Sequence, residues 1–217
     1  MSSSILVVIS GNGSNLQAII DGCQSGSIKA RICAVISNVP AVFGLDRARK
    51  AGIEAIELDH RAYALRSDYD RALAEEIDRY APDLIVLAGF MRILTAEFVQ
   101  RYQGKLINIH PSLLPKYQGL HTHKRAIEAG DSEHGATVHF VSAELDGGPA
   151  IIQGAVPILA TDDESSLAQR VQQQVEHSIY PVAINWCLQQ KISLSERGAL
   201  LDGELLPVTG FQYATDS

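Results

Sequence analysis

Short, uninterrupted apolar runs alternate along this chain with longer segments in which apolar residues recur at helical spacing. Residues 5–9 (ILVVI) and 83–88 (DLIVLA) lack the alternation of a half-exposed strand, and such runs are typical of strands covered on both faces. Residues 66–80 carry their apolar side chains on one face and stop before Pro82, which predicts an amphipathic helix. Strands separated by helices indicate parallel pairing through right-handed crossovers.

The same patterns continue along the chain and predict an α/β fold, a doubly wound and mostly parallel sheet with helices on both faces. We expect a single domain over residues 1–217, with a nucleotide-binding half at about 1–100, a differently built half at about 101–205 and a polar surface tail at 206–217. Further strands are predicted at 31–36, 53–58, 106–109, 135–141 and 151–157, and further helices at 16–20, 43–51, 96–102, 124–129 and 163–190.

Composition changes this picture mainly by what it excludes. Of the 217 residues 46% are apolar, so the chain can fill a core without disulfide or metal staples. Acidic residues outnumber Lys and Arg by 25 to 18, a net charge of −7, which argues against a nucleic-acid partner. No apolar run approaches the ~20 residues of a membrane span, and we expect no secretory signal at the N-terminus because it lacks a basic n-region. Because the three cysteines are isolated, they fit a reducing compartment, and we expect a cytoplasmic protein with no membrane partner.

The first candidate site is the loop at residues 10–15 (SGNGSN), between the first strand and the first helix. Ligands of open α/β sheets bind beyond the carboxyl ends of the strands, where glycines let the backbone approach and a helix start offers free N–H groups. Position 16 is Leu, so the third glycine of a dinucleotide fingerprint is missing, and no Walker A sequence follows. The loop therefore suits a phosphate monoester; the alternative is a tight turn before a capped helix.

Asn108 and His110 end the strand predicted at 106–109. Because they stand at i and i+2, their side chains leave the strand on one face. An amide there can stabilise a developing oxyanion and an imidazole can move a proton, a pair that suits acyl transfer. The alternative is that His110 is a structural histidine.

A carboxylate comes from Asp146, which is followed by two glycines. Beside His110, its charge would favour the imidazolium form; the alternative is an ordinary turn residue. His139 alternates with Thr137 onto the polar face of its predicted strand, where it faces either the site or the sheet surface.

Seven histidines raise the question of a metal centre. The sequence has no HExxH, no paired cysteines and only one His-x-His, at His121 and His123. A serine nucleophile is not indicated either, because no GxSxG elbow occurs. We therefore expect chemistry that uses no metal.

Five segments together resemble the phosphoribosylglycinamide formyltransferase family, folate-dependent enzymes of purine synthesis. They occur in the family's order and spacing, and the resemblance runs from about residue 5 to about residue 206. The Asn-x-His and Leu-Leu-Pro element is shared with other formyl-folate enzymes, whereas the first and fourth segments narrow the resemblance to the glycinamide ribonucleotide branch. The segments are residues 9–16 (ISGNGSNL), 88–94 (AGFMRIL), 108–115 (NIHPSLLP), 119–123 (GLHTH) and 144–149 (ELDGGP).

The resemblance implies 10-formyltetrahydrofolate as cosubstrate and glycinamide ribonucleotide as substrate, with catalysis and folate binding in the half at about 101–205. Asn108 would hold the oxyanion, His110 would transfer the proton and Asp146 would tune it. The binding roles it implies are Gly13, Ser14 and Asn15 for the ribonucleotide phosphate, Glu176 for the ribose hydroxyls, and Arg66, Met91, Arg92, Ile93, Leu94 and Asn108 for the folate.

The chain departs from the family pattern in two places. Gln118 stands where the family often has Pro, which should loosen that turn. Arg170 and Glu176 stand one residue further apart than the family pattern, and one inserted residue rotates a helix face by about 100°.

Other functions carry different expectations. A 10-formyltetrahydrofolate hydrolase would use Asn108, His110 and Asp146 with water as acceptor. Such hydrolases are longer chains with an added N-terminal regulatory domain. A methionyl-tRNA formyltransferase has an extra C-terminal domain, and a net charge of −7 is poor for RNA. A non-catalytic phosphate-binding module would not need Asn108, His110 and Asp146 together. We expect a monomer or a homodimer.

Overall fold

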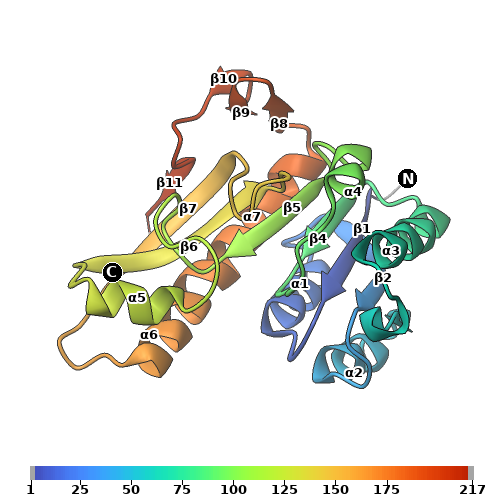
Figure 1. The fold of residues 1–217 in the computed structure, drawn as a ribbon. Coiled ribbons are helices and arrows are strands. Elements are labelled where there is room, and N and C mark those ends of the chain that lie inside the picture. The colour runs from blue at the N-terminus through green and yellow to red at the C-terminus, as the bar shows by residue number, and fades with distance from the viewer. Residues whose placement is uncertain (1–2, 215–217) are drawn as a thin grey trace. The chain divides into compact units, whose positions relative to one another are not determined.

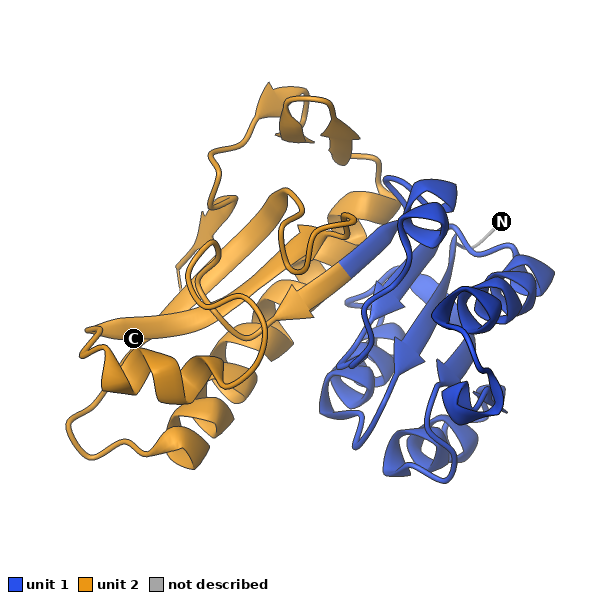
Figure 2. Ribbon diagram, in the orientation of Figure 1, with its two compact units in different colours: residues 1–107 blue, residues 108–217 orange. Residues whose placement is uncertain are grey.

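The apolar run at the start of the chain forms the buried centre of the first of two compact units. In the computed structural model, which describes residues 3–214, these units cover residues 1–107 and 108–217 (Figures 1 and 2). The first contains β1 (Ser3–Ile9), α1 (Ser14–Ser25), β2 (Ala30–Ser37), α2 (Phe43–Lys50), β3 (Ala55–Glu57), the 3₁₀ helix η1 (His60–Ala62), α3 (Arg66–Tyr80), β4 (Leu84–Leu87) and α4 (Ala96–Arg101).

Four strands of the first unit are parallel, in the order β4-β1-β2-β3. The side chains of residues 5–9 in β1 are fully buried, as expected for a strand covered on both faces. Thr95 caps α4 as its hydroxyl accepts from the backbone N–H of Phe98 at 3.3 Å. The strands and helices predicted in this region are confirmed, and the carboxyl ends of β1 and β4 lead into the loop at 10–15 and the segment at 88–94.

The second unit combines a sheet with a long, interrupted helix. β5 (Leu106–His110) crosses the boundary between the units, and Asn108 and His110 belong to the second. The unit continues with α5 (Thr122–Glu128), β6 (Glu133–Phe140), β7 (Ala150–Pro157), α6 (Glu164–Arg170), the π-helix η2 (Val171–Glu176), α7 (His177–Leu188), β8 (Ile192–Ser195), β9 (Gly198–Leu201), β10 (Glu204–Leu205) and β11 (Phe211–Tyr213).

Pairing in the second unit differs from the parallel pattern of the first. β6 and β7 are antiparallel, because the loop at 141–149 that joins them contains no crossover helix. β8, β9 and β10 form a separate small antiparallel sheet, which the sequence pattern did not predict. None of the helices within residues 3–214 has the length and apolar composition that a membrane span requires.

The predicted surface tail at 206–217 needs a correction. Within it, β11 pairs in parallel with β7, in register from Phe211 opposite Ile152 to Tyr213 opposite Gly154. The strand is largely exposed, so no burial pattern marks it in the sequence. Its pairing with β7 and an edge-to-face contact between the Phe211 and Trp186 rings, with centroids 5.4 Å apart, hold it in place. Residues 215–217 of the predicted tail lie outside the described part of the chain.

Candidate active site

His110 lies at the end of β5 with both ring nitrogens engaged. Nε2 is 2.9 Å from the Tyr117 carbonyl oxygen, and Nδ1 is 3.4 Å from Oδ2 of Asp146. Because a carbonyl oxygen only accepts, Nε2 must carry a proton. Nδ1 faces the Asp146 carboxylate. The buried imidazole is therefore held at both nitrogens, with a proton on Nε2.

Asp146 reaches His110 from the loop between β6 and β7. Its backbone has φ +50°, a left-handed conformation that Asp tolerates. A Cβ on Gly148 would lie 1.8 Å from the Phe140 carbonyl oxygen, so only glycine lets this loop fold back onto the end of β6. The Asp146 carboxylate also accepts from the Gly119 N–H at 2.9 Å, which ties this loop to the one that follows His110. The structure thus brings together the His–Asp pair that the sequence indicated.

His139 faces the site, which settles the choice that strand alternation left open. Its Nδ1 lies 2.9 Å from the Phe140 carbonyl oxygen and therefore carries the proton, so Nε2 is the acceptor for the Asn108 amide at 3.3 Å. Nε2 is also 4.0 Å from Oδ1 of Asp146. Burial lowers the pKa of His139, which keeps the ring neutral. His139 thereby turns the Asn108 NH₂ group into the site, with its second N–H left for a ligand.

Two buried side chains that sequence reasoning missed hold the loop after His110. Thr137 Oγ1 donates to the Ser112 carbonyl at 2.7 Å and accepts from the Leu114 N–H at 3.1 Å. Gln153 Nε2 donates to the Leu114 carbonyl at 3.0 Å and to Thr137 Oγ1 at 2.8 Å. Alternation already placed Thr137 beside His139, but only the pairing of β6 with β7 places Gln153 there.

In the first unit, the loop at 10–15 has the form of an anion site. α1 begins at Ser14, and its N-cap is Gly13 at φ +74°, a residue without a side chain that could cap the first N–H groups. The first turn, residues 14–17, contains no acidic residue, so the positive end of the helix dipole is not neutralised locally. The loop can therefore offer backbone N–H groups to a phosphate.

Ser10 joins this loop to the segment at 91–94. Its hydroxyl accepts from the Met91 N–H at 2.8 Å and lies 2.5 Å from Asn38 Oδ1. Met91 is 72% exposed and Ile93 50%, whereas Leu94 is buried, so this segment offers an apolar surface.

Helix α3 packs beside the same segment. The Arg92 guanidinium lies 5.0 Å from the ring centroid of Tyr69, and Arg66 is exposed one turn before Tyr69 on the same helix face. Buried Asp70 accepts from the Thr95 N–H at 2.6 Å and fixes the end of the segment. Asp70 is a supporting residue that the sequence motifs did not single out, and Ser10, although part of the loop motif, had no role assigned to it.

Glu176 lies at the end of the π-helix η2, in the stretch where we expect one residue more than in the family pattern. A π-turn closes i→i+5 hydrogen bonds and can take up one inserted residue, so η2 has the form that would absorb the expected rotation of about 100°. Val171, Val175 and Glu176 are all buried. The predicted helix at 163–190 is thus confirmed in position but interrupted at 171–176.

Two further histidines, His134 buried and His123 half-buried, form a pair outside this cluster. The His123 and His134 rings pack edge to face with centroids 5.0 Å apart. Burial lowers the pKa of both imidazoles, to about 4 for His134. Within residues 3–214 no group of three or more His, Cys, Asp or Glu side chains is placed to hold a metal ion.

This pair predicts a pH dependence of stability. His134 stays neutral in the folded chain down to about pH 4, while the unfolded chain takes up a proton near its ordinary value of 6.5. The free energy of unfolding should therefore fall as the pH drops from 6.5 toward 4. His134→Gln should remove about 2 kcal/mol of that fall, measured by urea unfolding at pH 7 and pH 4.5. His121→Gln, at an exposed histidine, is the control. If the free energy of unfolding fell by the same amount between the two pH values in wild type and in His134→Gln, the prediction would be contradicted.

Comparison with known proteins places the whole chain in one group. The family model described as Formyl transferase matches residues 3–184. The phosphoribosylglycinamide formyltransferase of Escherichia coli K12 is 56% identical over 213 residues, 98% of this chain and 99% of that protein. The enzyme of the same name from Haemophilus influenzae is 48% identical over 207 residues, 95% of this chain and 97% of that protein.

A solved structure of the same kind agrees with the fold. Phosphoribosylglycinamide formyltransferase from Coxiella burnetii is 45% identical and superposes with a TM-score of 0.94, covering 99% of this chain and 100% of that one. This likeness confirms the α/β fold class predicted from the sequence. The roles of the individual site residues stay predictions.

Proposed function

The chain belongs to the formyl transferase family, and on that premise we propose that it transfers the formyl group of 10-formyltetrahydrofolate to the amine of glycinamide ribonucleotide, a step of purine biosynthesis. The observation that carries this proposal is the cluster of Asn108, His110 and Asp146, which supplies an oxyanion donor and a proton-transfer pair within a chain of this family. A water acceptor, as in a hydrolase, would use the same cluster, but no close relative reported above carries that name.

In the proposed reaction the substrate amine attacks the formyl carbon. A C–N bond to the ribonucleotide amine forms, the bond from the formyl carbon to N10 of the folate breaks, and one proton passes from the amine to N10. Asn108 donates its free amide N–H to the oxygen that becomes negative in the tetrahedral intermediate. His110 supplies the proton to the departing folate nitrogen, and Asp146 stabilises the imidazolium that does so.

The nitrogen of His110 that meets the substrates is Nε2. Asp146 holds Nδ1 from one side, so Nε2 is the position whose partner can be exchanged. In the structure that partner is the Tyr117 carbonyl, and we propose that the reacting nitrogen takes its place. Tyr117 has φ +57°, and the segment around it is held by Gln118, whose side-chain amide lies 3.5 Å from the Asp146 carbonyl oxygen.

Binding roles follow the family pattern residue by residue. Gly13, Ser14 and Asn15 bind the phosphate at the start of α1, and Glu176 contacts the ribose hydroxyls. The exposed Arg66 and the segment Met91, Arg92, Ile93 and Leu94 bind the folate, and the family pattern assigns Asn108 to the folate as well. Support for the folate segment is its apolar surface and the anchoring of its backbone by Ser10 and Asp70.

We further propose a cytoplasmic enzyme, monomeric or homodimeric, that needs no metal. An amide donor and a His–Asp pair already supply the oxyanion contact and the proton that this reaction requires. The isolated cysteines and the acidic composition fit a cytoplasmic location.

One assay tests the function directly. Purified protein is incubated with 10-formyltetrahydrofolate and glycinamide ribonucleotide, and formylated product and free formate are both measured. We expect product only when the ribonucleotide is present. Formylation no faster than a protein-free blank would overturn the proposal, and release of formate without ribonucleotide would identify a hydrolase.

The phosphate loop has its own test in Gly13→Val. Gly13 has φ +74°, and a Cβ there would lie 2.8 Å from the Gly44 Cα, so valine must move the loop. We expect the KM for glycinamide ribonucleotide to rise by roughly 10-fold or more, with the KM for the folate unchanged.

The matched control for this test is Gly26→Val at the opposite end of α1. Gly26 is also left-handed, at φ +79°, but a Cβ there meets nothing within 4 Å. It should reduce stability without changing either KM. An unchanged ribonucleotide KM in Gly13→Val would move the phosphate site elsewhere.

A further inference from the structure

The start of α2 packs directly against the phosphate loop. The Gly44 N–H donates to the Gly11 carbonyl at 3.1 Å, one residue into α2. A Cβ on Gly44 would lie 2.8 Å from that same carbonyl oxygen, so only glycine allows this approach. Helix α2 is therefore the support on which the loop rests.

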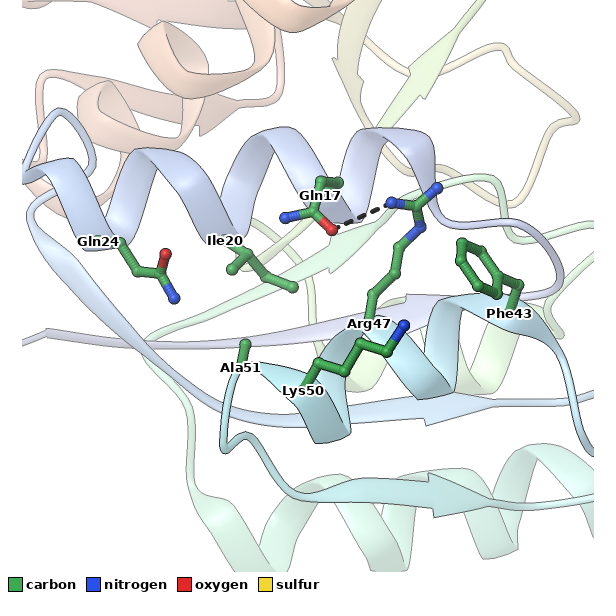
Figure 3. Close-up of a pocket in the computed structure, with 7 residues that line it drawn as sticks. All are labelled: Gln17, Ile20, Gln24, Phe43, Arg47, Lys50 and Ala51. Atoms are coloured by element: carbon green, nitrogen blue, oxygen red, sulfur yellow. Dashed lines mark hydrogen bonds between the residues drawn. The ribbon is translucent and has the colours of Figure 1, made fainter.

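Arg47, one turn further along α2, binds the loop with its whole guanidinium group. Nε donates to the Asn12 carbonyl at 2.9 Å, and Nη2 lies 3.3 Å from Asn12 Oδ1. Nη1 donates to Gln17 Oε1 at 3.1 Å, across a cavity of about 310 Å³ between α1 and α2 (Figure 3). One rigid fork thus joins the loop to the first turn of α1.

The hydrogen bond from Arg47 to the Asn12 carbonyl also sets the direction of the next N–H group in the loop. In a planar trans peptide the carbonyl of one residue and the N–H of the next point in opposite directions. By holding the Asn12 carbonyl toward α2, Arg47 fixes the plane of the Asn12–Gly13 peptide and aims the Gly13 N–H to the other side. Gly13 is the residue at which the loop enters α1.

The charge of Arg47 adds to this effect. All three of its acceptors are neutral amide oxygens, so these contacts do not cancel the positive charge. The guanidinium lies 4.6 Å from the ring centroid of Phe43, and the Lys50 ammonium lies 5.6 Å from the same centroid. A cation held beside the loop favours an anion at the start of α1.

We propose that Arg47 is a positioning residue for the phosphate-binding loop, acting on the ligand through Asn12 and the first turn of α1. The inference rests on the proposed function, since it takes the loop at Gly13–Asn15 as the site of the ribonucleotide phosphate. It assigns a specific task to a helix that no sequence motif connected with the substrate.

The test compares Arg47→Met with Arg49→Met. Methionine keeps an unbranched, largely apolar side chain and removes the donors and the charge. Arg49 stands on the same helix but pairs with Asp46 and Glu57, each at 3.0 Å, away from the loop. We expect Arg47→Met to raise the KM for glycinamide ribonucleotide by roughly 10- to 100-fold, with kcat and the folate KM little changed. Arg49→Met should leave all three constants at their wild-type values.

Arg47→Lys separates geometry from charge. Lysine keeps the charge but cannot form the fork, so the KM should stay raised by about 10-fold. Full recovery in Arg47→Lys would show that charge alone suffices and would overturn the positioning role, as would an unchanged KM in Arg47→Met. If Gly13→Val raises the KM while Arg47→Met does not, only this inference fails. If neither does, the phosphate site itself lies elsewhere. Thermal melting of each variant checks that the fold is kept.

Discussion

Replacing His110 with alanine is expected to lower kcat for formyl transfer by roughly 10²- to 10⁴-fold, the range that a positioned general acid or base contributes. The KM values for both substrates should change little, because His110 acts on the proton that moves in the transition state. Its Nε2 already carries a proton, and its Nδ1 faces Asp146 at 3.4 Å. Both nitrogens are therefore placed for proton transfer, and we assign His110 no separate role in substrate binding. Single-turnover rates with both substrates saturating measure the effect.

Burial of His110 makes a second variant necessary, because alanine leaves a cavity next to Asp146. His110→Asn is smaller but polar, and it should be as inactive as His110→Ala while melting closer to wild type. Asp146→Asn keeps the shape and the acceptor for the Gly119 N–H, yet removes the charge that stabilises the imidazolium. It should therefore lower kcat as well. A folded His110→Asn variant with near wild-type kcat would refute the proton-transfer role.

Much of the fold was predictable because strands that are buried on both faces appear in the sequence as continuous apolar runs. β1 and β4 are continuous apolar runs, and α3 is a one-faced helix that stops before Pro82. The misses have a common cause. β11 and the small sheet of β8 to β10 bury few side chains, Ile192 and Ala199 among them, so their pairing leaves only a weak pattern of apolar residues in the sequence.

The candidate site was predictable only in part, where local strand geometry places side chains on one face. Asn108 and His110 follow from strand alternation, since i and i+2 share a face on any strand. Asp146 was expected beside His110 from its own motif, but the other contacts of these two residues do not follow, because they come from elements far apart in sequence. The His139 tautomer that orients Asn108, the Gln153 support and the Arg47 fork all depend on which backbone carbonyl lies beside them. The π-turn at η2 was visible only as one extra residue, and its shape comes from packing on both sides of it.

Asn108→Ala is the second large effect we expect, a loss of roughly 10²- to 10³-fold in kcat, as found when a single oxyanion donor is removed. Asn108 has one N–H committed to His139 Nε2 at 3.3 Å, and the neutral His139 can accept but not donate there. The amide is therefore held with its oxygen and its second N–H in fixed positions, and the donor needs no rearrangement when the formyl oxygen becomes negative. The folate KM should rise in addition, since Asn108 is also proposed to contact the folate.

Two further variants decide whether Asn108 acts on the transition state or only on binding. Asn108→Asp is nearly isosteric, but it replaces the donor with a carboxylate facing the developing oxyanion, so its kcat should fall at least as far as that of Asn108→Ala. His139→Ala leaves the donor in place and removes only what orients it, and a smaller loss of about 10-fold is expected. If Asn108→Ala raised the folate KM with kcat unchanged, the amide would serve ground-state binding alone. The order Asp, Ala and then the His139 variant, from slowest to fastest, is what an oriented oxyanion donor requires.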